Sequence, residues 1–259
     1  KFSVLNAIKL FYVGAFFSQA LPSAVGGDPV RIYMSYRYGL TVREAINGVL
    51  LERVVTVVAL IIVVAFSQPW LLPRLDNASI DIMIPTIIII IASAIIGIAV
   101  LLNFDRLPKT LMRWQGVRGL GNLGIDGRKV FLSKKHFPLV LFWGILTHVN
   151  ISISVFLIGM GLNLDISLIN CMALMPLVVM IMTIPISIGG WGVRETAMVS
   201  LFGLVGVPNE GALVLSVLVG LIGIVASLPG GLIWLLNRED KDEIDGKNIE
   251  SDFSLEKSL

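Results

Sequence analysis

The sequence predicts an all-α, polytopic membrane protein with two pseudo-repeats, each interrupted by a Pro-Gly-Gly helix break. Three observations lead to this fold class: an apolar composition, long uncharged runs and a repeated motif. Of the 259 residues, 56% are apolar and 15% are charged, whereas soluble domains hold about 45–50% apolar and about 25% charged residues. This chain has too few polar residues to cover the core of a soluble globular protein. It is also too apolar to be a disordered protein.

Five segments are apolar over the length of a membrane span. A bilayer core about 30 Å thick requires roughly 20 apolar residues of helix, and none of these segments shows the alternation of a barrel strand. Two shorter apolar stretches, 10–27 and 196–206, are expected to be broken or re-entrant elements. The five expected full spans are 46–66, 80–102, 137–160, 168–186 and 212–236.

Residues 1–236 are expected to form a single transmembrane domain. The remaining segment, 237–259, carries eight acidic and four basic residues, and we expect this charged tail to be disordered. The chain begins with Lys1 close to an apolar stretch, which indicates either a fragment that lacks one or two N-terminal helices or a processed terminus. The single cysteine, Cys171, excludes an intrachain disulfide framework and a multi-cysteine zinc site.

Loop charge predicts the orientation of the chain in the cell membrane. The 103–136 loop contains eight Lys and Arg residues against two Asp residues. Cytoplasmic loops carry the Lys/Arg excess, so we expect this loop in the cytoplasm. Counting crossings from there places 28–45 and 187–195 on the same side. The basic loop serves either as an orientation signal alone or also as a contact to anionic headgroups.

An internal repeat divides the chain. Residues 22–31 and 185–194 share the pattern P-x-x-[VI]-G-G-x-x-V-R at an offset of 163. Each copy ends an apolar stretch and precedes a short segment and then a full span. We infer two related halves, 10–66 and 170–236, with 80–160 between them. The crossing count favours a parallel repeat, but the relation is inverted if either broken segment re-enters.

The repeated breaks are candidate ligand sites. Proline removes a backbone donor, and a glycine pair lets the chain leave helical geometry. The freed backbone groups must face protein, water or a bound polar group, and breaks in corresponding halves point to a transporter site. Arg31 and Arg194 follow the breaks and suit an anion such as a phosphate. Alternatively, the breaks only shape helix ends and the arginines anchor at the interface. The break residues are Pro22, Gly26, Gly27, Pro185, Gly189 and Gly190.

Charged side chains at membrane depth are costly, usually paired and functional. Asp28 and Arg31 share a face if their segment is helical. Glu52 is expected to pair with Arg194 or Arg31 and to line a polar cavity; alternatively, Glu52 and Arg53 lie at the headgroup level. The candidate residues for a lipid headgroup are Asp28, Arg31, Glu52, Arg53, Arg194 and Glu195.

These motifs resemble those of a known family. The run Pro22…Gly26-Gly27-Asp28…Arg31, followed by Glu52-Arg53, resembles the transmembrane region of lysylphosphatidylglycerol synthases. The run Pro185…Gly189-Gly190…Gly192-Val193-Arg194-Glu195 is similar to that family's second motif. The resemblance covers nearly the whole chain except the tail. It implies a flippase-like domain that handles an anionic phospholipid or a polyprenyl-phosphate lipid. The family's soluble domain for aminoacyl transfer has no room after the last span, so that activity is not expected.

Three functions remain open. The first is binding or translocation of an anionic lipid, the second an accessory or scaffold subunit of a membrane glycosyltransferase or lipid synthase, and the third a membrane-embedded lipid transferase. The sequence holds no P-loop, G-x-S-x-G, H-E-x-x-H or Cys/His metal set, so we expect no enzyme activity, cofactor or metal. His148 either hydrogen-bonds another helix or relays protons. We expect membrane lipids as partners, a glycosyltransferase or lipid-modifying enzyme as a further candidate, and no nucleic acid.

Overall fold

The computed structural model describes residues 2–21, 26–75, 77–104, 115–183, 187 and 189–256. Every regular element in these residues is a helix, and four helices are long and apolar enough to cross a membrane. The chain is therefore a multi-pass helical membrane protein, as its composition predicts. The four long helices are α3 (Val42–Leu71), α4 (Asn77–Asn103), α6 (His136–Gly161) and α9 (Asn209–Glu256). The candidate spans comprise all of α3 and α6, Ile80–Asn103 of α4 and Asn209–Leu236 of α9.

The shorter helices form two hairpins and two connections. Helices α1 and α2 are joined at the first Gly-Gly break, and α7 and α8 at the second. Helix η1 links α3 to α4, and α5 lies between α4 and α6. Their bounds are α1 (Val4–Ala20), α2 (Gly27–Arg37), η1 (Leu72–Arg74), α5 (Gln115–Phe131), α7 (Leu168–Met182) and α8 (Val193–Gly203).

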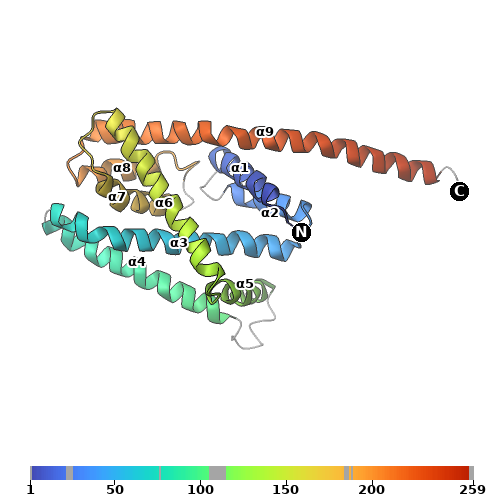
Figure 1. Ribbon diagram of the computed structural model, residues 1–259, viewed down its shortest axis with the longest axis horizontal. Helices are drawn as coiled ribbons and strands as arrows, with labels where there is room; N and C mark the ends of the chain where they lie inside the picture. The colour runs from blue at the N-terminus through green and yellow to red at the C-terminus, as the bar shows by residue number, and fades with distance from the viewer. Residues whose placement is uncertain are drawn as a thin grey trace.

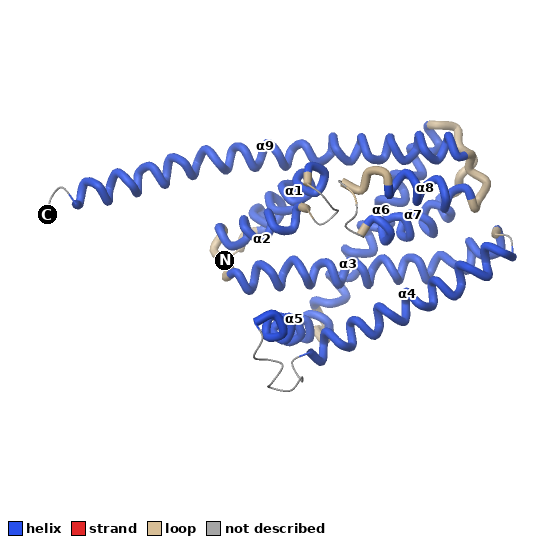
Figure 2. Tube along the Cα trace, turned by 180° about the vertical axis from the view of Figure 1, so that it is seen from behind, coloured by secondary structure: helices blue, strands red, loops and turns tan. Residues whose placement is uncertain are grey.

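Helices α3 and α9 run in opposite directions and enclose the two hairpins (Figure 1). Figure 2 shows the same arrangement from behind: α1 and α2 occupy one half of the space between α3 and α9, and α7 and α8 occupy the other half. Helix α1 packs on α9, and α7 packs on α3. We call the end with α5 and the 37–42 connection the α5 end, and the end with η1 and the 162–167 connection the η1 end.

The expected full span over 168–186 is wrong. Helix α7 has only 15 residues, about 22 Å at 1.5 Å per residue, which is too short for a bilayer core of about 30 Å. Its apolar composition reflects burial in the protein core, which an all-round apolar helix occupies as readily as it occupies lipid. Cys171, Leu174 and Val178 are fully buried against Met198 and Phe202 of α8. The crossing count that favoured a parallel repeat therefore loses its basis.

Two segments that were not expected to be regular are helical. Part of the 103–136 loop forms α5, and α9 continues through the charged segment to Glu256. The segment 237–256 contains many Glu and Lys residues, which are good helix formers, and no proline to end the helix.

Candidate functional site

The first break places a tight hairpin inside the bundle. Helix α1 ends at Ala20 and α2 begins at Gly27; Pro22 lies outside the described residues. The Gly27 amide donates a hydrogen bond to Ser18 Oγ at 3.2 Å. A Cβ atom on Gly27 would overlap the backbone carbonyl of Gly14, so only glycine lets α2 lie this close to α1.

The second break has a different backbone but a corresponding place. Pro185 lies outside the described residues, whereas Gly189, Gly190 and Gly192 have φ values of 56°, 81° and 81°. This left-handed region favours glycine because it has no Cβ atom. A Cβ on Gly189 would lie 3.1 Å from the Gln19 carbonyl oxygen. Gln19, near the end of α1, and Gly189, just before α8, therefore lie side by side.

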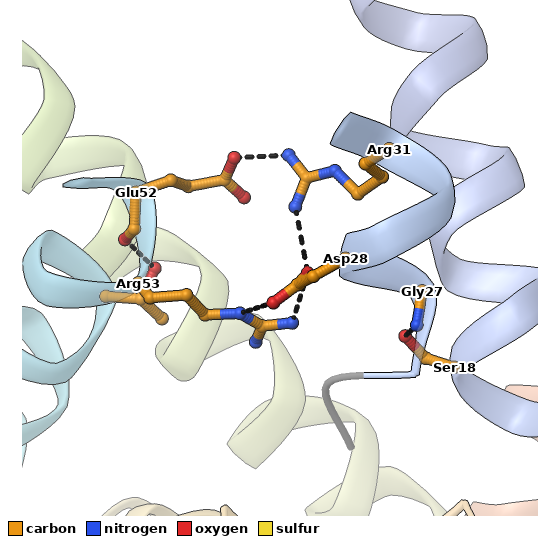
Figure 3. A network of polar contacts seen from close by, with 7 residues as sticks. Ser18, Gly27, Asp28, Arg31, Glu52 and Arg53 are labelled. Atoms are coloured by element: carbon orange, nitrogen blue, oxygen red, sulfur yellow. Dashed lines mark hydrogen bonds and ion pairs between the residues drawn. The ribbon is translucent and has the colours of Figure 1, made fainter. Parts of the chain in front are cut away.

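Four charged side chains form one cluster between α2 and α3 (Figure 3). Arg53 donates from Nε and Nη2 to the two carboxylate oxygens of Asp28, both at 2.8 Å. Arg31 forms an ion pair with Glu52, and its Nη1 lies 3.7 Å from Asp28 Oδ1. The two arginines and two carboxylates balance in charge, which reduces the cost of burying them.

A cavity of about 240 Å³ lies between α1, α2 and α3. Apolar side chains of α1 form one wall, including Leu10, and residues from Glu44 to Glu52 of α3 form another. Arg31 lies at this cavity with 17% of its side chain exposed, whereas its partner Glu52 is 49% exposed. Among the described residues, Nε of Arg31 has no hydrogen-bond partner. The site therefore presents a cation whose hydrogen-bonding capacity is not fully used.

The second arginine is enclosed. Arg194 is 4% exposed, donates to Glu195 at 2.7 Å and to Ser216 Oγ at 3.2 Å, and stacks over Trp191 at 4.6 Å. Its guanidinium occupies the space above Gly220, where a Cβ would overlap it. This arginine is satisfied by protein groups, in contrast to Arg31.

The structure thus sorts the six predicted site residues into two groups. Asp28, Arg31, Glu52 and Arg53 lie together, and Arg194 and Glu195 pair with each other. Of the two expected partners of Glu52, Arg31 is the one observed; the pairing with Arg194 is not, because Glu195 neutralises Arg194 locally.

Sequence reasoning missed several contributors to the site. Ser18 and Gln19 are polar residues just before the first break, and only this position in the sequence could have indicated that they contribute to the site. Ser216 stands at the repeat offset from Arg53, so aligning the halves further would have found it. His148, singled out earlier, places Nε2 3.2 Å from the Thr56 carbonyl oxygen, a contact between α6 and α3. Within the described ranges, no three His, Cys, Asp or Glu side chains gather as a metal site would require.

Fold and site together define a multi-pass membrane protein with charged residues held beside interrupted helices. The model of the family described as lysylphosphatidylglycerol synthase TM region matches residues 1–231. The chain therefore belongs to this family, as its motifs indicate. Comparison with curated proteins and with solved structures finds no match.

Proposed function

We propose that this protein binds the headgroup phosphate of an anionic lipid in the cavity between α1, α2 and α3 and moves the lipid across the membrane. The observation that carries the proposal is Arg31: a largely buried guanidinium at an open cavity, whose ion-pair partner Glu52 is half exposed. Guanidinium binds phosphate through two parallel hydrogen bonds. A phosphate that displaced the exposed carboxylate of Glu52 would supply this geometry.

The neighbouring groups favour an exchange of partners at Arg31. Asp28 is held by two hydrogen bonds from Arg53 and lies 3.7 Å from Arg31, so it keeps the arginine in place while Glu52 leaves. The apolar wall around Leu10 suits the start of an acyl chain. An anionic phospholipid and a polyprenyl phosphate share the phosphate and the apolar chain, so both remain candidates.

An inverted relation between the two proposed halves would favour translocation over binding alone, and the arrangement of the helices supports it. Adding 163 to the bounds of α1 and α2 gives positions within three residues of the bounds of α7 and α8. The same addition places the start of α3 within four residues of the start of α9. Helices α3 and α9 run in opposite directions (Figure 1), and the pairing of α1 with α9 corresponds to that of α7 with α3. Two inverted halves around a central site are typical of alternating-access transporters. In this proposal the α5 end is cytoplasmic, and the open first half and the closed second half represent one of two states.

A lipid-translocation assay tests the proposal. Purified protein is reconstituted with fluorescent phosphatidylglycerol, and dithionite quenching reports the transfer of the label between leaflets. We expect wild type to exceed empty vesicles, Arg31→Ala to lose most of the activity, and Arg31→Lys to retain a part because it keeps the charge but not the paired hydrogen bonds. Arg37→Ala is the matched control, since Arg37 is on the same helix, exposed, and bonded to Tyr33 outside the cluster. Wild-type rates equal to those of empty vesicles for several anionic lipids would overturn translocation.

A further inference from the structure

Helix α5 has two different faces, and the inner one fixes it to the bundle. A Cβ on Gly124 would overlap the carbonyl oxygen of Leu101 at the end of α4, and one on Gly127 would lie 3.3 Å from Leu51 of α3. Leu123 is buried on the same face. Small residues at these positions let α5 lie directly against both long helices.

Asp126 fastens the helix to the start of α3. Its carboxylate accepts hydrogen bonds from Asn47 at 2.7 Å and Lys129 at 2.9 Å, and it lies 3.4 Å from Arg43. The donated bond from Lys129, together with Asn47 and Arg43, holds the pKa of Asp126 below its ordinary value despite partial burial. Its negative charge is therefore neutralised within the protein and does not repel an anionic surface.

The outer face of α5 combines apolar and basic residues. Ile125 and Lys129 lie one turn apart on this face, and Leu132, the residue after the end of α5, continues their spacing. Leu132 and the side chain of Lys129 are each 72% exposed. Lys134 and Lys135 follow directly and are exposed. Exposed apolar side chains beside lysines are typical of helices that lie in the headgroup region, with the apolar groups inserted and the ammonium groups at the phosphates.

The position of α5 fits this environment. It follows the end of one candidate span, Asn103, and precedes the start of the next, His136, which places it at the depth of a membrane surface. Both views show α5 foreshortened while α3 and α4 run across the picture (Figures 1 and 2), so α5 lies across the direction of the spans. A helix in this orientation lies along the membrane plane.

We infer that the outer face of α5, with Ile125 and Lys129, and the turn that follows it, with Leu132, Lys134 and Lys135, bind the anionic lipid headgroups of the adjacent leaflet. Charge complementarity selects this occupant. Each lysine near an anionic leaflet raises the affinity for that leaflet about five-fold. The apolar side chains insert into the leaflet but do not distinguish anionic from neutral headgroups. The inference is separate from translocation, because none of these residues lines the cavity at Arg31.

Depth measurement on the intact chain tests the inference. In a Cys171→Ala background, Leu132→Cys carries a spin label, and the protein is placed in nanodiscs of phosphatidylcholine alone or with about one third phosphatidylglycerol. We expect anionic lipid to lower the accessibility of the label to a water-soluble relaxation agent at least about two-fold, and high salt to reverse this because screening weakens the attraction. The double variant Lys134→Gln/Lys135→Gln should strongly reduce the composition dependence, because only Lys129, which is bonded to Asp126, remains of the three lysines. The Asp126 contacts stay intact in this variant.

Two controls make the outcome decisive. A label at Phe66→Cys, an exposed residue within α3, should report the same accessibility in both lipid mixtures. Size-exclusion profiles should be equal for all variants. Equal accessibility at Leu132 in both mixtures would overturn the inference, as would a composition dependence of the same size in the double variant as in the parent. A site for a protein partner would give the former result, since no such partner is present in the discs.

Discussion

At the scale of single residues, the four-charge cluster combines a rigid pair with an exchangeable one. Asp28 is 8% exposed and receives two hydrogen bonds from Arg53, whereas Glu52 is half exposed in its pair with Arg31. A carboxylate in water contributes little through an ion pair, but a buried charge that loses its partner is costly. The two carboxylates should therefore respond differently to the same substitution.

We expect Asp28→Asn to destabilise the protein and Glu52→Gln to leave its stability nearly unchanged. The loss of charged hydrogen bonds at Asp28 costs about 1.5–3 kcal/mol, or a drop in melting temperature of roughly 3–12 °C for a domain of this size. Glu52→Gln should also raise the affinity of Arg31 for a phosphate lipid, because it removes the competing carboxylate. Thermal unfolding in detergent, with and without added phosphatidylglycerol, measures both effects. Equal melting temperatures for the two variants would contradict this division of roles.

A second residue-scale prediction concerns Gly27. Gly27→Ala should lower stability, because its Cβ would overlap the backbone carbonyl of Gly14, which no rotamer change can move. The cost should reach about 1–3 kcal/mol, the range for overpacked sites. Gly48→Ala is the matched control: nothing lies within 4 Å of its Cβ position in α3, and alanine is favoured over glycine in a helix by about 1 kcal/mol. We expect Gly27→Ala to lower the melting temperature and Gly48→Ala to raise it. An unchanged melting temperature in Gly27→Ala would show that α2 can move away from α1 without loss of stability.

At the scale of elements, apolar length predicted the long helices and failed for α7. The runs around α3, α4, α6 and α9 exceed the membrane thickness, and that requirement decides their conformation. The run at α7 is apolar because protein surrounds it, and composition cannot distinguish a protein environment from lipid. Helix α5 was missed because its glycines lower helix propensity; their spacing at Gly121, Gly124 and Gly127 is itself the sign of a close helix contact.

The site was predictable to a similar degree. Charges at membrane depth are usually paired, which led us to expect Glu52 to pair with Arg194 or Arg31, and the structure has the pair with Arg31. The sequence could not show that Asp28 accepts two hydrogen bonds from Arg53, because that pairing depends on how α2 and α3 pack. It also could not show that Arg194 is closed off by Trp191 and Ser216, which lie on two different elements.

The attachment of α5 provides an element-scale prediction. Asp126→Ala should release α5 from α3, because it removes the acceptor shared by Asn47, Lys129 and Arg43. Hydrogen exchange in 121–131 should become at least about ten-fold faster, the equivalent of about 1.4 kcal/mol, while exchange in α7 stays unchanged. Unchanged exchange in α5 would mean that the glycine contacts alone hold it.

The pKa of Asp126 sets the pH range of this attachment. Since the pKa in the folded state lies below the ordinary value of 3.8, the stabilisation is complete above that value and is lost as the pH falls through the lowered pKa. Exchange in α5 of the wild type should therefore be insensitive to pH between about 5 and 8 once intrinsic exchange rates are corrected.

At the scale of the whole molecule, the sites at Arg31 and Arg194 differ in the way that the proposed translocation by a two-state transporter would require. The first half opens a cavity at Arg31, and the second encloses Arg194. If the halves exchange these roles, contacts that close the second half also keep the first half open. Weakening the enclosure of Arg194 should then shift the population toward the opposite state, although Arg194 and the first cavity share no contact in the structure.

Glu195→Gln tests this coupling. The substitution weakens the charged hydrogen bond to Arg194, and a loss of about 1.4 kcal/mol changes a two-state ratio about ten-fold. In a Cys171→Ala background, Gly48→Cys places an exposed thiol at the first cavity, where a membrane-impermeant maleimide reaches it from the α5 side. We expect Glu195→Gln to slow labelling of this thiol several-fold, because the state in which the first cavity is open becomes less populated. Glu210→Gln, a change in the first turn of α9 away from the Arg194 contacts, should leave the rate as in the parent. An unchanged rate in Glu195→Gln would show that the two halves open independently, and alternating access would have to be abandoned for this chain.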